Sequence, residues 1–228
     1  VFERISREFG VNVRAGKPRV VSRETVNGPG RADSILDRTI RLSADETAQL
    51  KVRVVATCEP LERGTTVTIK TDGHQLLPEG SALSKLQLEA LEQGAADGVS
   101  AGPIEGAALQ DVAVAIEAIE LFGEESSPQA IRIGVASAVR EAIRDAGGAV
   151  MRPLMTITVV VPHDKMGGVL GDLQSRSAMI SGTEQGADSA IIHGECALEA
   201  LLGYTTELRS MTQGRGQFTM EFARFDIG

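Results

Sequence analysis

Aromatic side chains are scarce in this sequence. Its 228 residues include no Trp, one Tyr and six Phe, so aromatic residues make up only 3% of the chain. A core of ordinary size must therefore be packed by Val, Ile, Leu and Ala, and a hydrophobic share of 42% is large enough for this. The length predicts one large domain or two smaller domains, each with its own core.

Cysteine and histidine are also rare, which limits the metal and redox chemistry that the sequence predicts. Cys58 and Cys196 lie far apart and form no CxxC pair, so we expect two reduced, partly buried thiols in a cytosolic protein. His74, His163 and His193 have no paired carboxylates or cysteines at ligand spacing. We therefore expect no metal site.

Long apolar runs and an excess of positive charge are absent as well. No segment is apolar over the length that a bilayer requires, and no signal peptide is visible. The net charge of −8 argues against non-specific adhesion to nucleic acid or membrane, although it leaves room for a local basic contact with a shaped RNA. We expect neither membrane nor DNA as a partner. The chain opens on VFERISREFG without Met, which favours a fragment of something longer.

The sequence also lacks a recognisable catalytic motif. Gly16-Lys17-Pro18 follows Gly10 at one residue more than a phosphate loop allows, and Pro stands where that loop needs Ser or Thr for magnesium. Glu124-Glu125 is typical of a solvated acidic turn, because no second carboxylate or histidine is placed beside it. Ser175 and Ser210 lack the context of a nucleophile. Residue chemistry alone predicts an interaction protein with no catalytic residue and no bound cofactor.

The first 149 residues carry patterns of strands and helices. Val1 to Gly10 is expected to form the second half of a helix, and residues 27–30 (NGPG) are a turn signal. The hydrophobic pattern predicts extended or strand segments over residues 19–24, 38–43, 50–58, 65–70 and 111–121. The last of these strands is expected to be close to buried on both faces. Helices are predicted over residues 83–95 and from Pro128, with Ser127 as N-cap, and the corner at 122–127 is expected to be an exposed contact platform.

From Val150 onward the pattern is clearer. Strands are predicted over residues 155–161, 178–185 and 189–195, with a helix over 166–173. A helix from Leu201 and a strand over Phe218 to Phe222 complete the order β-α-β-β-α-β. This order is typical of the ferredoxin-like arrangement, in which two helices cover one face of an antiparallel sheet. We therefore place a domain boundary near Val150 and assign the whole chain to the α+β class.

The last helix and strand are separated by polar residues that packing does not require. The apolar residues of these two elements recur at helical spacing and then alternate as in a half-buried strand: Leu201, Tyr204, Leu208, Met211, Phe218, Met220 and Phe222. Thr206, Arg209, Gln213 and Arg215 are left over near the helix end. Arg in a last helical turn commonly only balances the helix dipole, so the pattern alone allows a structural or a binding role.

Two long motifs resemble a known family. Residues 170–176 read LGDLQSR, and residues 202–216 read LGYTTELRSMTQGRG. In this order and at this spacing, they resemble the last domain of translation elongation factor G. The front of the chain resembles the same family at residues 7–11 (REFGV), 16–18 (GKP), 23–25 (RET) and 59–64 (EPLERG).

This resemblance implies a domain order. Residues 1–18 would be a remnant of domain III, residues 19–149 a domain IV-like unit, and residues 150–228 a domain V-like ferredoxin fold. It also implies a left-handed βαβ crossover in domain IV, which is an exception to the usual handedness rule. GTP and Mg²⁺ are expected to bind a G domain that this chain does not contain, so the chain itself is predicted to be non-catalytic.

The resemblance also implies a function on the ribosome. Domain IV would enter the decoding region of the small subunit, and domain V would contact the stalk base and the GTPase-activating rRNA of the large subunit, to promote translocation or ribosome recycling. The candidate contact residues are Arg176, Arg209, Gln213 and Arg215 in domain V, and Ser126, Ser127, Arg38 and Arg41 at the tip of domain IV.

The predicted tip departs from the family pattern. Residues 28–51 lack the glycine-rich, basic segment with a Gly-Gln-Tyr-Gly-His core, and residues 123–127 keep the serines without the preceding histidine. Ser177 and Met179 stand where arginines are expected after Arg176. A tip with fewer cations should bind rRNA phosphates less strongly. The sequence therefore favours a divergent paralogue over an ordinary translocase.

Two alternatives stay open at this point. Within the family, the alternative is a ribosome-protection factor that displaces an antibiotic. In another class, the alternative is a ferredoxin-like module that dimerises and senses a small molecule. The second alternative requires a dry, ligand-sized pocket at the Gly167-Gly168 end, whereas an exposed strip of Arg176, Arg209 and Arg215 would argue against it.

Overall fold

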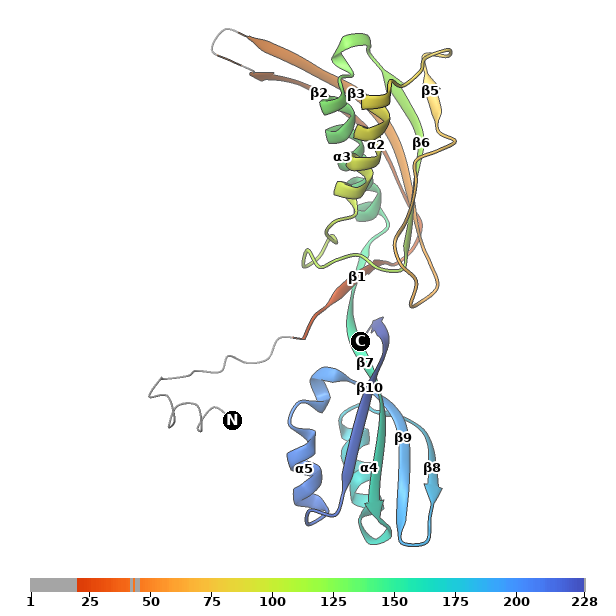
Figure 1. Ribbon diagram of the computed structural model, residues 1–228, viewed down its shortest axis with the longest axis vertical. Helices are drawn as coiled ribbons and strands as arrows, with labels where there is room; N and C mark the ends of the chain where they lie inside the picture. Colours follow the sequence, from red (N-terminus) through yellow and green to blue (C-terminus); the bar gives the residue numbers. More distant parts are fainter. Residues whose placement is uncertain (1–19, 42, 44–45, 228) are drawn as a thin grey trace, which may run out of the picture.

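A computed structural model describes residues 20–41, 43 and 46–227, which form two α+β domains joined end to end (Figure 1). We call residues 20–147 the first domain and residues 148–227 the second domain. The predicted helix over Val1–Gly10 and the predicted domain III remnant lie outside the described residues.

The first domain is built on a five-stranded sheet. Its strands are β2 (Gly30–Arg41), β3 (Thr47–Pro60), β4 (Thr68–Lys70), β5 (Gln75–Leu77) and β6 (Val112–Leu121). The order is β2-β3-β6-β4, and β5 also pairs with β6. β2 and β3 form a long antiparallel hairpin, from Gly30 opposite Cys58 to Arg41 opposite Thr47. β4 and β5 run parallel to β6, so β5, α2 and β6 form a βαβ unit. The hand of this crossover stays a prediction.

Two helices, α2 (Lys85–Gly98) and α3 (Pro128–Asp145), pack against each other beside this sheet (Figure 1). α2 begins with a capping box, in which the Ser84 hydroxyl accepts from the Gln87 backbone N–H and the Gln87 side chain accepts from the Ser84 N–H. The helices approach closely because Gly94 has no side chain. A Cβ at this position would lie 2.6 Å from the backbone oxygen of Arg132.

The core of the first domain is aliphatic, as the composition predicts, and lies between the sheet and the helices. It includes Val52, Val54, Ile119, Val135 and Val139, all with no exposed surface. The expectation that β6 is close to buried on both faces is wrong. Its inward residues are buried, but the residues between them stay half-buried or exposed because, among the described residues, no element covers the outer face of the sheet.

The second domain has the predicted order β-α-β-β-α-β. Its elements are β7 (Gly148–Pro162), α4 (Met166–Ser175), β8 (Met179–Gln185), β9 (Ser189–Ala197), α5 (Tyr204–Met211) and β10 (Gln217–Ile227), with short 3-10 turns at η2 (His163–Lys165) and η3 (Leu198–Leu201). The strands pair antiparallel in the order β8-β9-β7-β10. The ferredoxin-like arrangement and the two-domain α+β class are thereby confirmed.

The last helix and strand differ from their predicted form in two ways. α5 begins at Tyr204 rather than Leu201, because Gly203 adopts a left-handed conformation (φ 81°) that interrupts the turn. Phe218 packs edge-on against the Tyr204 ring, with the ring centroids 4.9 Å apart. Met220 and Phe222, which were expected to be half-buried, are 43% and 56% exposed. β10 is an edge strand of the second sheet, so its side chains have a neighbouring strand on one side only.

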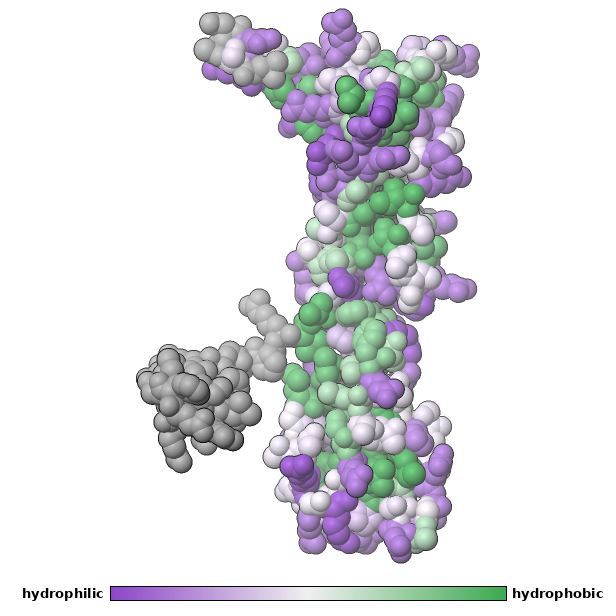
Figure 2. Space-filling model, in the orientation of Figure 1, coloured by the Kyte–Doolittle hydropathy of each residue, from purple (hydrophilic) through white to green (hydrophobic). Residues whose placement is uncertain are grey.

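A continuous strand joins the domains. β7 starts at Gly148, where it pairs with β1 (Arg23–Val26) of the first domain, and then runs on as a central strand of the second sheet. The expected boundary near Val150 therefore falls inside β7. Figure 2 shows a narrow waist at this level, with apolar residues on its visible face. We call this waist, formed by β1, the start of β7 and the end of β10, the neck.

Candidate functional site

All the predicted contact residues except Arg176 lie in two places, far apart in the molecule. One is the end of the first domain opposite the neck, where the β2–β3 hairpin ends and the 3-10 turn η1 (Gly123–Glu125) links β6 to α3 (Figure 1). We call this end the tip. The other is the C-terminal end of α5 in the second domain.

Ser126 is not available at the tip surface. It is 1% exposed, and its hydroxyl donates to the Lys51 carbonyl oxygen (2.6 Å) and accepts from the Phe122 backbone N–H (2.8 Å). Its own carbonyl accepts from the side chain of Gln87 (2.8 Å). The prediction that Ser126 contacts rRNA is corrected: its polar groups are used to hold the corner against β3 and α2.

Ser127 also has a structural task. Its hydroxyl accepts from the Ala130 backbone N–H (3.3 Å), so it caps α3, and Pro128 occupies the first helical position. The cap was predicted from the sequence and is confirmed. The hydroxyl oxygen accepts this bond and the O–H group can still donate, so the assignment of Ser127 as a contact residue stays a prediction.

The cations at the tip are partly neutralised within the domain. Arg38 and Arg41 are exposed on β2. Lys51, on the neighbouring strand, lies 3.0 Å from Asp37 and 4.8 Å from the centre of the Phe122 ring. The hydrogen bond to Asp37 raises the pKa of Lys51, and the same bond lowers the pKa of Asp37. The tip therefore offers two exposed guanidinium groups beside an internal ion pair.

Arg176 does not form an exposed strip with Arg209 and Arg215. Only 17% of its side chain is exposed. Its guanidinium donates to Asp172 (2.9 Å), to the Ala200 carbonyl oxygen (2.6 Å) and to Glu207, and it lies over the Tyr204 ring. The hydrogen bond to Asp172 raises the pKa of Arg176. The prediction is corrected because all three nitrogens of this guanidinium donate hydrogen bonds within the domain, which tie α4, η3 and α5 together.

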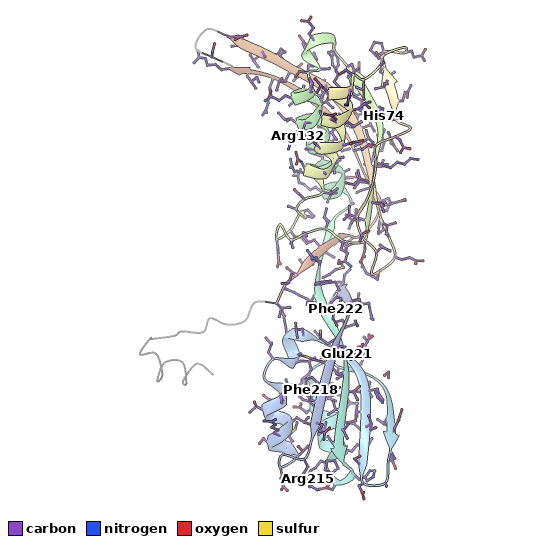
Figure 3. The ribbon with its side chains drawn as sticks, viewed as in Figure 1. His74, Arg132, Arg215, Phe218, Glu221 and Phe222 are labelled. Atoms are coloured by element: carbon purple, nitrogen blue, oxygen red, sulfur yellow. The ribbon has the colours of Figure 1, made fainter. Side chains whose placement is uncertain are left out.

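Arg209, Gln213 and Arg215 are exposed and lie around the end of α5, so we call them the α5-end cluster. The backbone turns sharply here: Gly214 N–H donates to the Arg209 carbonyl (2.7 Å), and Gln213 adopts a positive φ of 54°. Figure 3 shows Arg215 at the end of the second domain that lies away from the neck. Arg215 also lies 3.5 Å from Asp164 of η2. The structure thus brings these three predicted residues together on one end.

Thr212 fixes this turn and was not singled out by the sequence. It is fully buried, its hydroxyl donates to the Leu208 carbonyl (2.6 Å), and the same hydroxyl accepts from the Gly216 N–H (2.8 Å). A Cβ at Gly216 would lie 2.7 Å from that hydroxyl. The sequence carries no signal for this role, because threonine is also common at exposed positions, as at Thr205 and Thr206 of the same helix.

The histidines and cysteines have structural surroundings. The ring nitrogens of His74 and His163 lie 2.7 Å and 3.1 Å from backbone carbonyls, and His193 lies 3.3 Å from the Thr158 hydroxyl. Burial raises the pKa of the Cys58 thiol to about 11, which disfavours the nucleophilic thiolate. Within the described part of the chain, no group of three His, Cys, Asp or Glu side chains could hold a metal ion.

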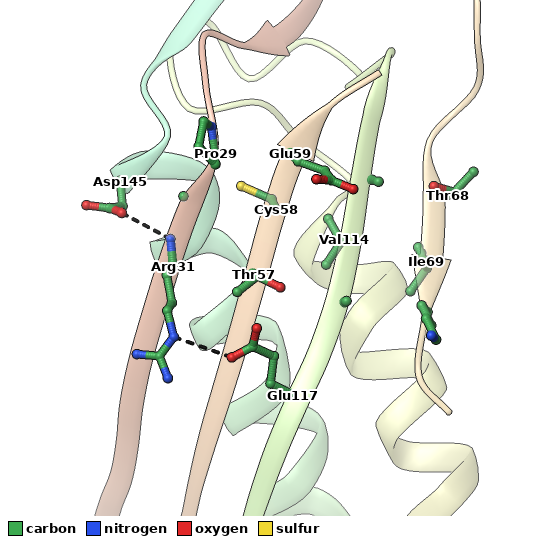
Figure 4. A pocket seen from close by; sticks show the side chains of 14 residues that line it. Pro29, Arg31, Thr57, Cys58, Glu59, Thr68, Ile69, Val114, Glu117 and Asp145 are labelled. Atoms are coloured by element: carbon green, nitrogen blue, oxygen red, sulfur yellow. Dashed lines mark hydrogen bonds and ion pairs between the residues drawn. The ribbon is translucent and has the colours of Figure 1, made fainter. Parts of the chain in front are cut away.

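A groove of about 670 Å³ crosses the open face of the first sheet (Figure 4). Thr57, Ala113 and Ala115 line it with small side chains, which leave space above the strands. Figure 4 shows Arg31 bridging one wall, with 3.4 Å to Glu117 and 3.0 Å from its backbone nitrogen to Asp145. At the Gly167-Gly168 end of the second domain, by contrast, a Cβ on either glycine would meet nothing within 4 Å. Those glycines lie on an open surface.

Comparison with known proteins identifies related sequences. A family model described as Elongation factor G C-terminus matches residues 149–227. Elongation factor G 2 of Syntrophus aciditrophicus (strain SB) is 33% identical over 228 residues, which are 100% of this chain and 32% of that protein. Elongation factor G 1 of Geobacter sulfurreducens is 33% identical over 226 residues, which are 99% of this chain and 32% of that protein.

A solved structure supports the same relationship. A crystal structure of a protein from Thermus thermophilus matches with a TM-score of 0.78 and 25% identity, over 100% of this chain and 32% of that chain. In the described residues, no helix is long and apolar enough to cross a membrane. The chain spans about a third of the length of the curated relatives that it matches. It corresponds to the C-terminal part of an elongation factor G or of a divergent elongation factor G-like protein.

Proposed function

We propose that this chain is the ribosome-binding C-terminal region of an elongation factor G-like translational GTPase. The observation that carries the proposal is the similarity to two elongation factor G proteins over essentially the whole chain. The intact protein would bind GTP and Mg²⁺ through a G domain outside this chain and would act in the cytoplasm. The chain itself would bind the ribosome without catalysing a reaction.

The domain arrangement suits a rigid probe. The first domain would enter the decoding region with its tip leading. The long hairpin and the two packed helices would keep it stiff along its length. The second domain would contact rRNA and protein at the stalk base of the large subunit. Its α5-end cluster presents two guanidinium groups and an amide, which are suitable donors to phosphate oxygens.

The charges favour a specialised step over ordinary translocation. At the tip, Lys51 is paired with Asp37, and the exposed Glu124 lies in the nearby corner, so few cations are free to meet rRNA. Each phosphate contact adds affinity through counterion release, and fewer contacts should give weaker, less salt-dependent binding. Recycling, or another step that needs brief occupancy of the decoding region, fits such a tip better than repeated translocation.

The deciding experiment uses the full-length protein and purified ribosomes. With a non-hydrolysable GTP analogue, we expect co-sedimentation with ribosomes and competition by elongation factor G. Absence of binding would overturn the proposal. Antibiotic resistance conferred on a sensitive host would instead identify a ribosome-protection factor. A metabolite-dependent dimer without ribosome binding would identify the small-molecule sensor.

A further inference from the structure

The neck is narrow, because a single strand, β7, passes through it and pairs there with the short β1 and with the end of β10. β1 contributes four residues to it, and its pairing with β7 ends at Arg23 opposite Met151. β10 ends beside the same residue, with Ile227 opposite Met151. Paired strands this few in number can twist about their axis. The side chains around the neck must therefore limit the angle between the two domains.

Arg63 touches both domains. It lies in the loop after β3, and its guanidinium is 3.5 Å from Asp111, a fully buried carboxylate of the first domain. The same guanidinium is 3.9 Å from Asp226 near the end of β10, in the second domain. It also lies 3.4 Å from the Thr25 hydroxyl on β1. One cation is therefore shared between carboxylates on opposite sides of the neck.

Arg152 repeats this arrangement. It lies on β7, just past the pairing with β1, and its guanidinium is 3.8 Å from Glu105 in the loop that precedes β6 of the first domain. Its other terminal nitrogen is 3.3 Å from Glu199 in η3 of the second domain. Arg63 and Arg152 thus each hold one carboxylate from each domain.

Glu105 and Asp111, the carboxylates of the first domain, lie in segments held by backbone hydrogen bonds. The buried side chain of Glu24 on β1 accepts from the backbone N–H groups of Ile104 (2.7 Å), Glu105 (2.9 Å) and Ala107 (2.8 Å). The loop that carries Glu105 is thereby fixed to β1. At the other side, the Leu61 N–H donates to the Asp111 carbonyl (2.8 Å), which anchors the loop that carries Arg63.

We propose that Arg63 and Arg152 form an electrostatic clamp that sets the angle between the first and second domains. Each arginine is attached to a rigid part of the first domain or the neck and pulls a carboxylate of the second domain towards it. Breaking the contacts to Asp226 and Glu199 frees the neck to bend while both folds stay intact. The clamp is a property of this chain alone, so it stands or falls independently of the ribosome proposal.

The expected size of the effect is modest but measurable. Partly exposed ion pairs each contribute little, and two such pairs shift the ratio of clamped to unclamped molecules by roughly 2- to 30-fold. Salt screens such pairs, so the same shift should be produced by raising the ionic strength to roughly 1 M, where the screening length is about 3 Å.

The test measures the distance between the domains by pulsed electron paramagnetic resonance on this chain. Spin labels are placed at Glu92→Cys on α2 and Gln174→Cys on α4, because both positions are exposed while Cys58 and Cys196 are buried. The clamp is opened with Glu199→Gln and Asp226→Asn together. These changes leave the contacts of Arg63 to Asp111 and of Arg152 to Glu105 in place, so no buried carboxylate loses its cation. Asp226→Asn also removes the pair of Asp226 with Arg224 (3.1 Å), which lies within the second domain.

We expect the distance distribution to broaden or shift in the double variant, and in the unaltered chain at high salt, with no change in circular dichroism. The matched control is Glu89→Gln with Glu117→Gln, which removes the same charge from ion pairs inside the first domain. This control should give the original distribution at low salt. A double variant whose distribution superimposes on the original would overturn the proposal, and so would an unaltered chain whose distribution does not respond to salt.

Discussion

The guanidinium of Arg176 lies over the ring of Tyr204, with its central carbon 5.0 Å from the ring centroid. The ring in turn packs on Phe218, so a charged group, an aromatic ring and a strand residue form one stack through the second domain. Arg176 belongs to a matched family motif, yet in this chain it holds the domain together from inside. A residue that belongs to a family motif can therefore have a purely structural role.

Arg176→Met should destabilise the second domain by about 2 kcal/mol, because hydrogen bonds to charged groups are lost at a position that water barely reaches. The unfolding of this domain can be followed separately, since Tyr204 is the only tyrosine and the chain has no Trp. Urea titration with tyrosine fluorescence measures the change. Arg209→Met, at an exposed position, should stay within about 0.5 kcal/mol of the original chain. Equal effects of both changes would contradict the assignment.

Tyr204 should ionise only at strongly alkaline pH. Burial raises the pKa of its hydroxyl from 10.0 to about 12. The unfolded chain therefore loses this proton first as the pH rises, so the second domain should lose stability between pH 10 and about 12. Tyrosinate absorbance measures the titration in the folded chain and in denaturant. A folded-state midpoint near that of the denatured chain would show that the ring is accessible.

Ser126→Ala should weaken the first domain by about 1–3 kcal/mol, because the Phe122 N–H and the Lys51 carbonyl would both lose their partner in a buried site. Ser127→Ala removes one helix cap and should cost about 1 kcal/mol. Circular dichroism during urea titration measures both. If the Ser126 change left stability unaltered and weakened ribosome binding by the full-length protein, the surface role first predicted for it would be restored.

Two substitutions of glycine by alanine should change the free energy of unfolding in opposite directions. At Gly94 in α2 a Cβ would lie 2.6 Å from the Arg132 backbone oxygen, so Gly94→Ala should force the helices apart and cost about 1–3 kcal/mol. At Gly171 in α4 a Cβ would meet nothing within 4 Å, so Gly171→Ala should stabilise α4 by up to about 1 kcal/mol. Thermal unfolding compares them. A stabilising change at Gly94 would mean that the helix contact is looser than described.

The α5-end cluster can be tested through the salt dependence of ribosome binding by the full-length protein. Arg209→Gln and Arg215→Gln should each weaken binding and each reduce the slope of log affinity against log salt by about 1, if each arginine neutralises one phosphate. Arg31→Gln, which alters an ion pair on the first sheet, serves as the control. An unchanged slope in both variants would remove this cluster from the interface.

The ferredoxin-like fold was predictable because its signals are local. Alternating strands and helical spacing each concern a few neighbouring residues, as does the Ser127-Pro128 start of α3 in the first domain. The first domain was predicted less well: the strand expected over residues 38–43 is β2, which begins at Gly30. β5 was missed because three residues carry no periodicity. The role of β1 was missed for another reason: it pairs with a strand about 125 residues later, and its sequence holds no mark of that partner.

The candidate contact residues were harder to predict. Asp172 stands four residues before Arg176, and this i,i+4 spacing was a visible sign that Arg176 would be paired along its own helix. The pairing with Glu207 and the burial of Ser126 have no such sign, because their partners come from distant elements. Arg209, Gln213 and Arg215 came together as expected because a single turn of chain carries all three.

β7 belongs to both domains, because it pairs with β1 at its start and with β9 further along. Any cut near residue 150 would deprive β1 of its partner and shorten the central strand of the second sheet. Force applied at the tip would pass through the peptide bonds of this strand rather than through a loop, and the second domain would receive it as a twist of its own sheet.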